Sequence, residues 1–238
     1  MTASAVIWHD VECGGYAEDL ELWRALAAEA DGPVLDVGAG TGRVALDLAA
    51  RGVEVVALDV DADLLAALSE RAAAAGLTVE TACADARWFD LGGRRFGLIA
   101  VPMQTLQLLP DAEARGAFLR TARRHLREGG VVAAALADAL DSFDAESDGL
   151  PEPDVATVDG VQYSSLPLAV VDEGGRAAIH RLRQADGAPE EHDVIRLARV
   201  DAAMLAEEAE AAGLEAQTAR RIPATDVYVG STVVILRG

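Results

Sequence analysis

Hydrophobic positions in the first 138 residues follow two patterns, short apolar runs and stretches with apolar residues three or four positions apart. The runs predict strands, and the spaced stretches predict helices. The expected strands are residues 32–37, 53–60, 77–84, 94–103 and 131–138. The expected helices are residues 17–30, 41–50, 61–76 and 111–130. Strands that alternate with helices indicate an α/β fold with a doubly wound, mostly parallel sheet covered by helices on both faces.

The pattern changes near residue 139, where an acidic, proline-bearing stretch begins. Residues 155–200 then contain short β-like runs broken by Asp-Gly, Glu-Gly-Gly and Asp-Gly, which predict an antiparallel β-meander. A helix and two strands are expected to end the chain, at residues 201–213, 214–222 and 231–238. The predicted segments are therefore residues 1–138, the insertion 139–200, and residues 201–238, which return to the first sheet.

Charge and composition narrow the classes of partner. The chain has 40 acidic and 20 basic residues, all of the latter arginine, and a formal net charge of −20. So acidic a surface repels phosphate backbones, which argues against a nucleic acid or an anionic membrane. No apolar run approaches the roughly 18 residues of a membrane span. The N-terminus lacks the basic start and apolar core of a signal peptide, so we expect a soluble, cytoplasmic protein.

Two cysteines, Cys13 and Cys83, stand far apart in the sequence. Neither belongs to a cluster with metal-ligand spacing, and a single pair is no disulfide framework. We expect two buried thiols and no metal site.

Residues 34–43 read VLDVGAGTGR, a strand-like run followed by glycines at 38, 40 and 42 and then by a helical stretch. Glycine lets the backbone turn tightly and lets a ligand approach without meeting a Cβ atom. A helix that follows offers free N–H groups and partial positive charge at its N-terminus. The pattern predicts a ligand site at this turn.

Two cofactor classes use such a turn, and they differ in detail. The dinucleotide fingerprint, Gly-x-Gly-x-x-Gly, would need a glycine where Arg43 stands. Asp36, two residues before the first glycine, would repel a pyrophosphate, whereas it suits an ammonium group or an ordered water. The turn therefore favours a nucleoside that carries an amino acid over one that carries two phosphates.

Residues 34–52, VLDVGAGTGRVALDLAARG, resemble the first motif of the class I S-adenosylmethionine-dependent methyltransferases. Further matches follow in the same order. Asp59 ends the second strand, Asp85 follows the third, and HLREGGVVAAAL resembles the helix, glycine turn and fifth strand of the family. The resemblance implies a Rossmann-like sheet of seven strands with one reversed strand, whose cofactor half is residues 33–138.

The same resemblance implies roles for single residues. An acidic residue at Asp59 would hold both ribose hydroxyls, and Asp85 would accept from the adenine amino group. Val60 and Ala86 would line the adenine slot. The cofactor-binding residues implied are Tyr16, Asp36, Gly38, Ala39, Gly40, Arg43, Asp59, Val60, Asp85, Ala86 and Val101.

Two more segments resemble the small-molecule branch of this family. Residues 8–23, WHDVECGGYAEDLELW, would be an N-terminal flap over the methionine portion, with Tyr16 reaching its carboxylate. Simple packing at the start of a helix is the alternative for Tyr16. Residues 139–200 resemble the β insertion of amino-sugar and other small-metabolite N-methyltransferases, which covers the acceptor and sometimes builds a dimer face. A homodimer through this insertion therefore stays open.

The fourth strand ends in Val101-Pro102-Met103-Gln104, where methyltransferases of nucleobases or protein amides tend to carry Asn/Asp-Pro-Pro-Tyr/Phe. This departure argues against such acceptors. The catalytic residues stay open, with Gln104 as a candidate to orient the substrate and His9 as the candidate base; both also have plain readings as solvated polar residues. His125 is expected in the core. Candidates to line the acceptor pocket are His180, His192, Trp8, Trp88, Tyr163 and Tyr228.

The expected activity is methyl transfer from S-adenosylmethionine to a nitrogen or oxygen of a small metabolite, with S-adenosylhomocysteine as product. The alignment of the acceptor with the sulfonium would then be the main task of the protein. Two alternatives stay open, a nicotinamide-dependent oxidoreductase and a non-catalytic S-adenosylmethionine-binding module. The identity of the acceptor is not contained in these patterns.

Overall fold

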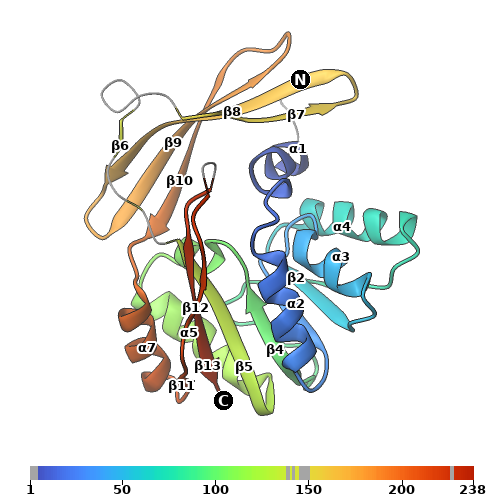
Figure 1. Ribbon diagram of the computed structural model, residues 1–238, viewed down its shortest axis with the longest axis vertical. Helices are drawn as coiled ribbons and strands as arrows, with labels where there is room; N and C mark the ends of the chain where they lie inside the picture. The colour runs from blue at the N-terminus through green and yellow to red at the C-terminus, as the bar shows by residue number, and fades with distance from the viewer. Residues whose placement is uncertain (1–4, 138–139, 141–142, 145–150, 226–227) are drawn as a thin grey trace. The chain divides into compact units, whose positions relative to one another are not determined.

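The computed structural model describes residues 5–137, 140, 143–144, 151–225 and 228–238 (Figure 1). The chain is divided into two compact units. The larger comprises Ala17–Asp138 and Val200–Gly238, and the smaller comprises Met1–Tyr16 and Ala139–Arg199. The division falls close to the positions where the hydrophobic pattern changes, and it groups the first 16 residues with the insertion.

A mostly parallel sheet forms the centre of the larger unit, in the order β11-β13-β5-β4-β1-β2-β3, with β12 also paired to β13. Its strands are β1 Val34–Val37, β2 Val55–Asp59, β3 Glu80–Cys83, β4 Phe96–Val101, β5 Leu126–Ala137, β11 Glu215–Ala216, β12 Arg220–Ile222 and β13 Ser231–Arg237. Strands β1 to β5 pair in parallel, and β13 runs antiparallel to β5. Because β11 and β12 share one position beside β13, the sheet has the predicted seven positions and one reversed strand.

Helices cover both faces of this sheet (Figure 1). One face packs against α2 (Leu20–Glu29), α3 (Arg43–Ala49) and α4 (Ala62–Ala74), and the other against α5 (Ala112–Arg124) and α7 (Ala202–Ala211). Adjacent residues of β1 belong to the cores on opposite faces of the sheet. Val34 lies in the core that contains Trp23 of α2, and Leu35 lies in the core that contains Phe118 of α5. The predicted doubly wound architecture is thus confirmed.

Short polar signals mark the ends of these helices. Asp61, Asp111 and Asp201 each accept a hydrogen bond from a backbone N–H of the first turn of α4, α5 and α7. Gly76 and Gly213 follow α4 and α7 with φ of 66° and 81°, the left-handed conformation that ends helices. No helix in the described ranges is long and apolar enough to cross a membrane.

The helix expected over residues 111–130 is shorter than predicted. It ends at Arg124, because Leu126 already pairs with Phe96 of β4. The register of β4 and β5 then shifts, so the LREGG segment is an irregularity inside β5. Glycine is needed in it because a Cβ on Gly130 would lie 2.8 Å from the Phe96 carbonyl oxygen.

The strand expected over residues 214–222 is divided into β11 and β12. Ala216 pairs with Leu236 and Arg220 with Val233, so the chain advances four residues against three of β13. One extra residue in one strand is a β-bulge, and it accounts for the break.

The smaller unit contains the predicted antiparallel meander. Its sheet has the order β10-β9-β8-β6, and β7 also pairs with β8. The strands are β6 Phe143–Asp144, β7 Asp154–Val158, β8 Val161–Asp172, β9 Arg176–Ala185 and β10 Glu191–Ala198. Tight turns lie at Asp159-Gly160, Gly174-Gly175 and Gly187, where the sequence places its glycine signals. The same unit includes helix α1 (Ala5–His9) and a π-helical turn over Asp10–Gly14.

The two cysteines do not form the expected pair of buried thiols. Cys83 is exposed and Cys13 is half-buried. Cys83 is open to solvent because it ends β3, the edge strand of the large sheet.

Candidate active site

The predicted cofactor residues of the larger unit follow the carboxyl ends of neighbouring parallel strands. Asp36 and the glycines belong to the end of β1, Asp59 and Val60 to that of β2, Asp85 and Ala86 to that of β3, and Val101 ends β4. Strand β1 lies between β2 and β4, and the strand order runs outward from it in both directions. Ligand crevices of open α/β sheets form at such a switch point.

The glycine bend, residues 38–42, has left-handed backbone at all of its glycines, with φ of 71°, 53° and 97°. The bend is fixed to β2 because Gly38 N and Ala39 N donate to the Leu58 carbonyl at 2.8 and 3.1 Å. Residues other than glycine rarely adopt this conformation, so the sequence pattern has a backbone cause.

Two of these glycines also make room for neighbouring side chains. A Cβ on Gly38 would lie 2.3 Å from Thr105 Cγ2, and one on Gly42 would lie 2.7 Å from Leu68 Cγ. Close packing of the protein therefore explains part of the glycine pattern, beside the tight turn and the ligand approach that the sequence predicts. Contact of the bend with a cofactor stays a prediction.

Asp36 is a fully buried carboxyl at the end of β1. Neither of its oxygens makes a hydrogen bond of normal length and angle among the described residues, although the Ala45 amide lies close enough to lower its pKa. Burial raises the pKa of Asp36 to about 7, the Arg43 guanidinium and the Ala45 amide oppose the rise, and the carboxylates of Asp59 and Asp19 add to it. The site therefore holds a buried acid that lacks a well-formed hydrogen bond and is poised to ionise near neutral pH.

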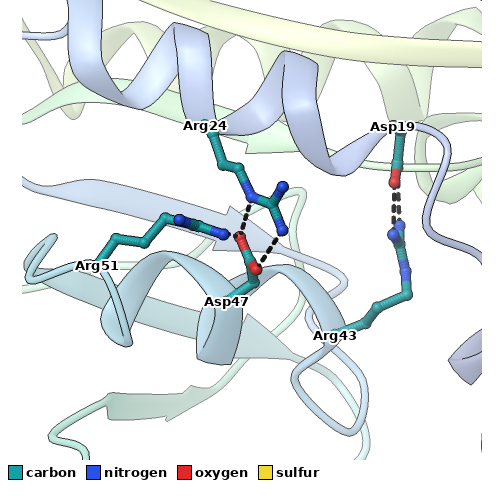
Figure 2. Close-up of polar contacts among 5 residues, drawn as sticks. All are labelled: Asp19, Arg24, Arg43, Asp47 and Arg51. Carbon is teal, nitrogen blue, oxygen red and sulfur yellow. Dashed lines mark hydrogen bonds and ion pairs between the residues drawn. The ribbon is translucent and has the colours of Figure 1, made fainter.

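Arg43, a predicted cofactor residue, binds a carboxylate of the protein. Its Nη1 and Nη2 lie 2.5 and 2.8 Å from the two oxygens of Asp19, which also accepts from Trp23 Nε1 at 2.7 Å (Figure 2). Beside it, Arg24 of α2 makes a similar pair with Asp47 of α3. The sequence analysis missed Asp19, for which the only local signal is a tryptophan four residues later in the same helix turn.

Asp59 is half-buried at the end of β2. One oxygen accepts from Gly40 N at 2.8 Å, and the other accepts from Asp61 N at 2.9 Å. Each carboxylate oxygen has a second lone pair, so both keep acceptor capacity for hydroxyl groups. The next residue, Val60, leaves 72% of its surface exposed, which gives an uncovered apolar side chain beside the carboxylate.

Asp85 binds Arg87, which the sequence analysis did not single out. The Arg87 guanidinium is 2.6 Å from Asp85 Oδ2, and its hydrogen bond is the main cause that holds the pKa of Asp85 below the usual value. Arg87 also lies over the ring of the exposed Trp88, 4.2 Å from its centre. Ala86, between the pair, is half-buried.

The end of β4 carries an unusual backbone conformation. Val101 is buried, and Met103 has φ of 54°, a left-handed conformation that costs a side-chain-bearing residue energy. Gln104, half-buried, begins the short 3₁₀ helix Thr105–Leu108. Its neighbour Gln107 accepts from Ala137 N at 2.9 Å and so fixes the end of β5. A methionine at this position gives no sequence signal for such a conformation.

Most of the remaining candidates lie in the smaller unit. His9, Tyr16, His180, His192, Trp8 and Tyr163 belong to the smaller unit, where Trp8 meets Tyr163 edge-on at 5.5 Å and the rings of His180 and His192 are 5.8 Å apart. Tyr16 is buried. Their roles toward the cofactor and acceptor stay predictions.

His125 is confirmed as a core residue. It is buried against Phe89, its Nδ1 lies 2.9 Å from the Thr121 carbonyl oxygen, and its Nε2 accepts from Leu91 N. Throughout the described ranges, no three His, Cys, Asp or Glu side chains gather as metal ligands would.

Comparisons with known proteins show what this geometry is similar to. Residues 34–130 match the family model described as methyltransferase domain. This segment, less than half of the chain, is therefore similar to a methyltransferase domain. No curated protein sequence matches the chain.

Solved structures extend the likeness beyond that segment. The methyltransferase CcbJ from Streptomyces caelestis is 23% identical with a TM-score of 0.73, over 94% of this chain and 98% of its own. CalS10 from Micromonospora echinaspora, an amino pentose methyltransferase with bound S-adenosylmethionine, is 20% identical with a TM-score of 0.72, over 100% and 99%. The sugar N-methyltransferase KedS8 from a Streptoalloteichus species is 22% identical with a TM-score of 0.72, over 100% and 95%.

These comparisons confirm the expected fold and the resemblance to S-adenosylmethionine-dependent methyltransferases. The methyltransferase domain covers the glycine bend, Asp59 and Asp85, while the structural likeness covers the β insertion as well. Neither alternative, a nicotinamide oxidoreductase or a non-catalytic binding module, finds support among them.

Proposed function

We propose that this methyltransferase domain binds S-adenosylmethionine at the carboxyl edge of its sheet and methylates a nitrogen or oxygen of a small molecule. The observation that carries the proposal is Asp36, whose buried oxygens make no hydrogen bond of normal length and angle among the described residues. Burying a carboxylate without a partner is costly, and an opposite charge offsets that cost. The ammonium group of a bound amino acid supplies this charge, directly or through a water.

The charges around Asp36 favour this class of cofactor over a dinucleotide. Among the charged groups that act on Asp36, Asp19 and Asp59 are negative and Arg43 is positive. Arg43 is paired with Asp19, so the pair is close to neutral as a whole, although Arg43 is still the largest single charge that lowers the pKa of Asp36. A pyrophosphate would add further negative charge, whereas S-adenosylmethionine brings a sulfonium and an ammonium against one carboxylate.

The residues present fit the parts of this cofactor. When bound, S-adenosylmethionine supplies a methyl group on a sulfonium, which is already a good leaving group. The residues of the chain then have to hold and align it, because positioning accounts for most of the rate gain in such a transfer. Asp59 would accept from the ribose hydroxyls with the lone pairs that Gly40 and Asp61 leave free, and Val60 would flank the adenine.

For the acceptor, we propose the amine nitrogen of a small molecule. CalS10 is an amino pentose methyltransferase, and KedS8 is a sugar N-methyltransferase. An amine that binds in its neutral form needs no general base at the moment of transfer.

The cofactor part of the proposal is tested by calorimetry with S-adenosylmethionine, S-adenosylhomocysteine and NADH. Both adenosyl ligands are expected to bind, and Asp59→Ala is expected to weaken them by about tenfold or more, since hydrogen bonds to a charged group are lost. Asp63→Ala, which removes an exposed carboxylate from the first turn of α4, is the matched control. Binding of NADH with no response to either adenosyl ligand would overturn the proposal.

The acceptor part is tested by incubating the protein with radiolabelled S-adenosylmethionine and a panel of amino sugars, other amines and hydroxyl compounds. Label is expected in an amine. Label confined to hydroxyl compounds would exclude the amine and leave the oxygen acceptor.

Two further expectations stay proposals. A homodimer through residues 139–200 is supported by Val155 and Val171, apolar side chains that are exposed on β7 and β8. Light scattering coupled to gel filtration decides between one copy and two. The cytoplasmic location rests on the sequence expectation alone.

A further inference from the structure

Arg87 binds the Asp85 carboxylate through its backbone N–H and through Nε and Nη2 of its guanidinium. Asp85 Oδ1 accepts from the Arg87 backbone N at 2.8 Å and from Nε at 2.9 Å. Oδ2 accepts from Nη2 at 2.6 Å and shares Nε at 3.1 Å. An arginine that binds a carboxylate through two nitrogens fixes the carboxylate plane as well as its charge.

Counting lone pairs shows what this grip leaves open. A carboxylate has about four acceptor positions, two on each oxygen. Oδ1 uses both of its positions on Arg87 N and Nε, while Oδ2 uses one on Nη2. The longer contact of Nε with Oδ2 shares the single Nε hydrogen that is already counted at Oδ1. One position on Oδ2 stays available, on an oxygen whose orientation Arg87 has already set. The carboxylate is 28% exposed, so a ligand has access to it.

Arg87 is itself held from two sides. Its backbone carbonyl accepts from Thr121 Oγ1 of α5 at 2.8 Å, and its guanidinium lies over the Trp88 ring. Cation–π contacts of this kind restrict the guanidinium without using its N–H groups. The arginine therefore acts as a fixed support rather than a freely moving surface charge.

The pair lies beside the carboxylate expected to hold the ribose. Cys83, the last residue of β3, pairs with Asp59 across the strands, and Ala84 N donates to the Asp59 backbone carbonyl at 2.9 Å. Asp85 follows directly. A nucleoside whose ribose is held by Asp59 therefore has its base near the loop that Arg87 braces.

We propose that Arg87 is a positioning residue for the adenine of the cofactor, because it orients Asp85 so that a single acceptor position on Oδ2 meets a hydrogen of the adenine amino group. The inference rests on the proposed function, since it presumes that the bound nucleoside is adenosine. It assigns to this chain's own Asp-x-Arg sequence a role that depends on the amino group of the base. A purely structural ion pair would have no such dependence.

The test compares S-adenosylhomocysteine with its analogue in which purine replaces adenine, so that the amino group is missing. Calorimetry is carried out on the wild type, Arg87→Ala, Arg87→Lys and the control Arg95→Ala. Arg95 is exposed, and its guanidinium donates to the backbone carbonyls of Gly93 and Arg94, so the control removes the same charge without breaking a side-chain pair. Circular dichroism melting checks that each variant is folded.

For S-adenosylhomocysteine, Arg87→Ala is expected to lose about tenfold in affinity and Arg87→Lys to lose less, since a lysine supplies charge without the fork. For the purine analogue, wild type and Arg87→Ala are expected to bind equally, because the group that Asp85 recognises is absent. This difference between the ligands is the coupling that a double-mutant cycle measures. Arg95→Ala is expected to match the wild type with both ligands.

Two results would overturn the inference. Arg87→Ala that binds S-adenosylhomocysteine as tightly as the wild type would show that Arg87 does not support recognition. An equal loss for both ligands would show a general effect on the loop or on charge. In either case wild-type binding of S-adenosylhomocysteine leaves the proposed function standing, whereas absence of that binding would defeat the proposed function itself.

Discussion

The side chain of Thr105 occupies the space beside Gly38 that a side chain at that glycine would need, with 2.3 Å between Thr105 Cγ2 and the position of a Cβ. The contact joins the glycine bend after β1 to the 3₁₀ helix after β4. The expected cofactor turn after β1 is therefore packed directly against the segment after β4, which contains Gln104, the candidate to orient the substrate.

Gly38→Ala is expected to destabilise the protein for two reasons. Its methyl group would overlap Thr105, which costs about 1–3 kcal/mol as overpacking, and a φ of 71° adds about 1–2 kcal/mol for a residue with a Cβ. Urea unfolding measures the sum. Adding Thr105→Ala to Gly38→Ala is expected to recover only the first part, and a double variant no more stable than Gly38→Ala would show that the overlap is not the cause.

Asp36→Asn is expected to change how cofactor binding depends on pH. The pKa of Asp36 is about 7 in the free protein, and a bound ammonium favours the ionised form, so binding to the wild type should weaken as pH falls below about 7. Asparagine does not titrate, so the variant should bind S-adenosylhomocysteine more weakly and with a flat profile in this range. Calorimetry between about pH 5.5 and pH 7.5 measures both.

Without ligand, Asp36→Asn is expected to benefit the protein, because it removes a cost to the stability of the folded state. Folding raises the pKa of Asp36 from 3.8 to about 7, so the folded state binds the proton more tightly and wild-type stability falls as pH rises through this interval. Asp36→Asn escapes that loss. Its stability relative to the wild type should therefore increase from about pH 4 to about pH 7, and a difference that does not change with pH would contradict the raised pKa.

Local patterns predicted the fold well because its strands, turns and helix ends each have a short sequence signal. Strand β1 is a short, mostly apolar run directly before the glycines, and Asp61 and Gly76 stand at the two ends of α4. Each of these signals acts through the residue's own backbone or its nearest turn. Physical cause and sequence position coincide, so no long-range information is needed.

The parts that escaped prediction depend on partners distant in the sequence or on backbone geometry without a signal. The pairing of Arg43 with Asp19, at the start of α2, has no signal in the sequence around Arg43, whose contact with the cofactor stays a prediction. The early end of α5 follows from the pairing of Leu126 with Phe96, which only the assembled sheet decides. Arg87 is close to Asp85 in sequence, yet its fork depends on how the loop after β3 is held against α5.

Met103→Gly is expected to raise stability and lower activity together. Glycine adopts a φ of 54° without strain, so the variant should gain about 1 kcal/mol. The rate of methyl transfer should fall, because strain kept at the end of β4 indicates that the fixed backbone serves the site. Urea unfolding and transfer of labelled methyl groups measure the two effects.

A matched control for Met103 is available in the same chain. Asp159 is the other non-glycine residue with positive φ, 50°, among the described residues, and it lies in the hairpin turn between β7 and β8. Asp159→Gly should relieve similar strain without a change in transfer rate. If Met103→Gly also keeps the full rate, its conformation serves only the turn.

Glu12 ties the N-terminal segment of the smaller unit to its sheet, and its loss is expected to be costly. Its oxygens lie 2.7 Å from Arg181 Nη1 and 2.7 Å from Arg183 Nε, and one accepts from Ser165 Oγ at 2.8 Å. Glu12→Gln would leave two largely buried guanidinium groups short of negative charge, a loss of about 3 kcal/mol. The exposed pair of Glu173 and Arg196 is the control, since Glu173→Gln should leave stability unchanged.

The effect of Glu12→Gln should also depend on pH with a definite sign. Burial acts to raise the pKa of Glu12, but the hydrogen bond from Arg183 and the charge of Arg181 outweigh it, so the pKa lies below its ordinary value of 4.5. A carboxyl whose pKa falls on folding stabilises the protein above that ordinary value and loses the contribution as acid protonates it. Unfolding followed from about pH 7 to about pH 3 should show the wild type and Glu12→Gln converging on the acid side. Curves that stay apart by the same amount at every pH would mean that the segment is held by packing around Trp8 and Tyr163 rather than by the carboxylate.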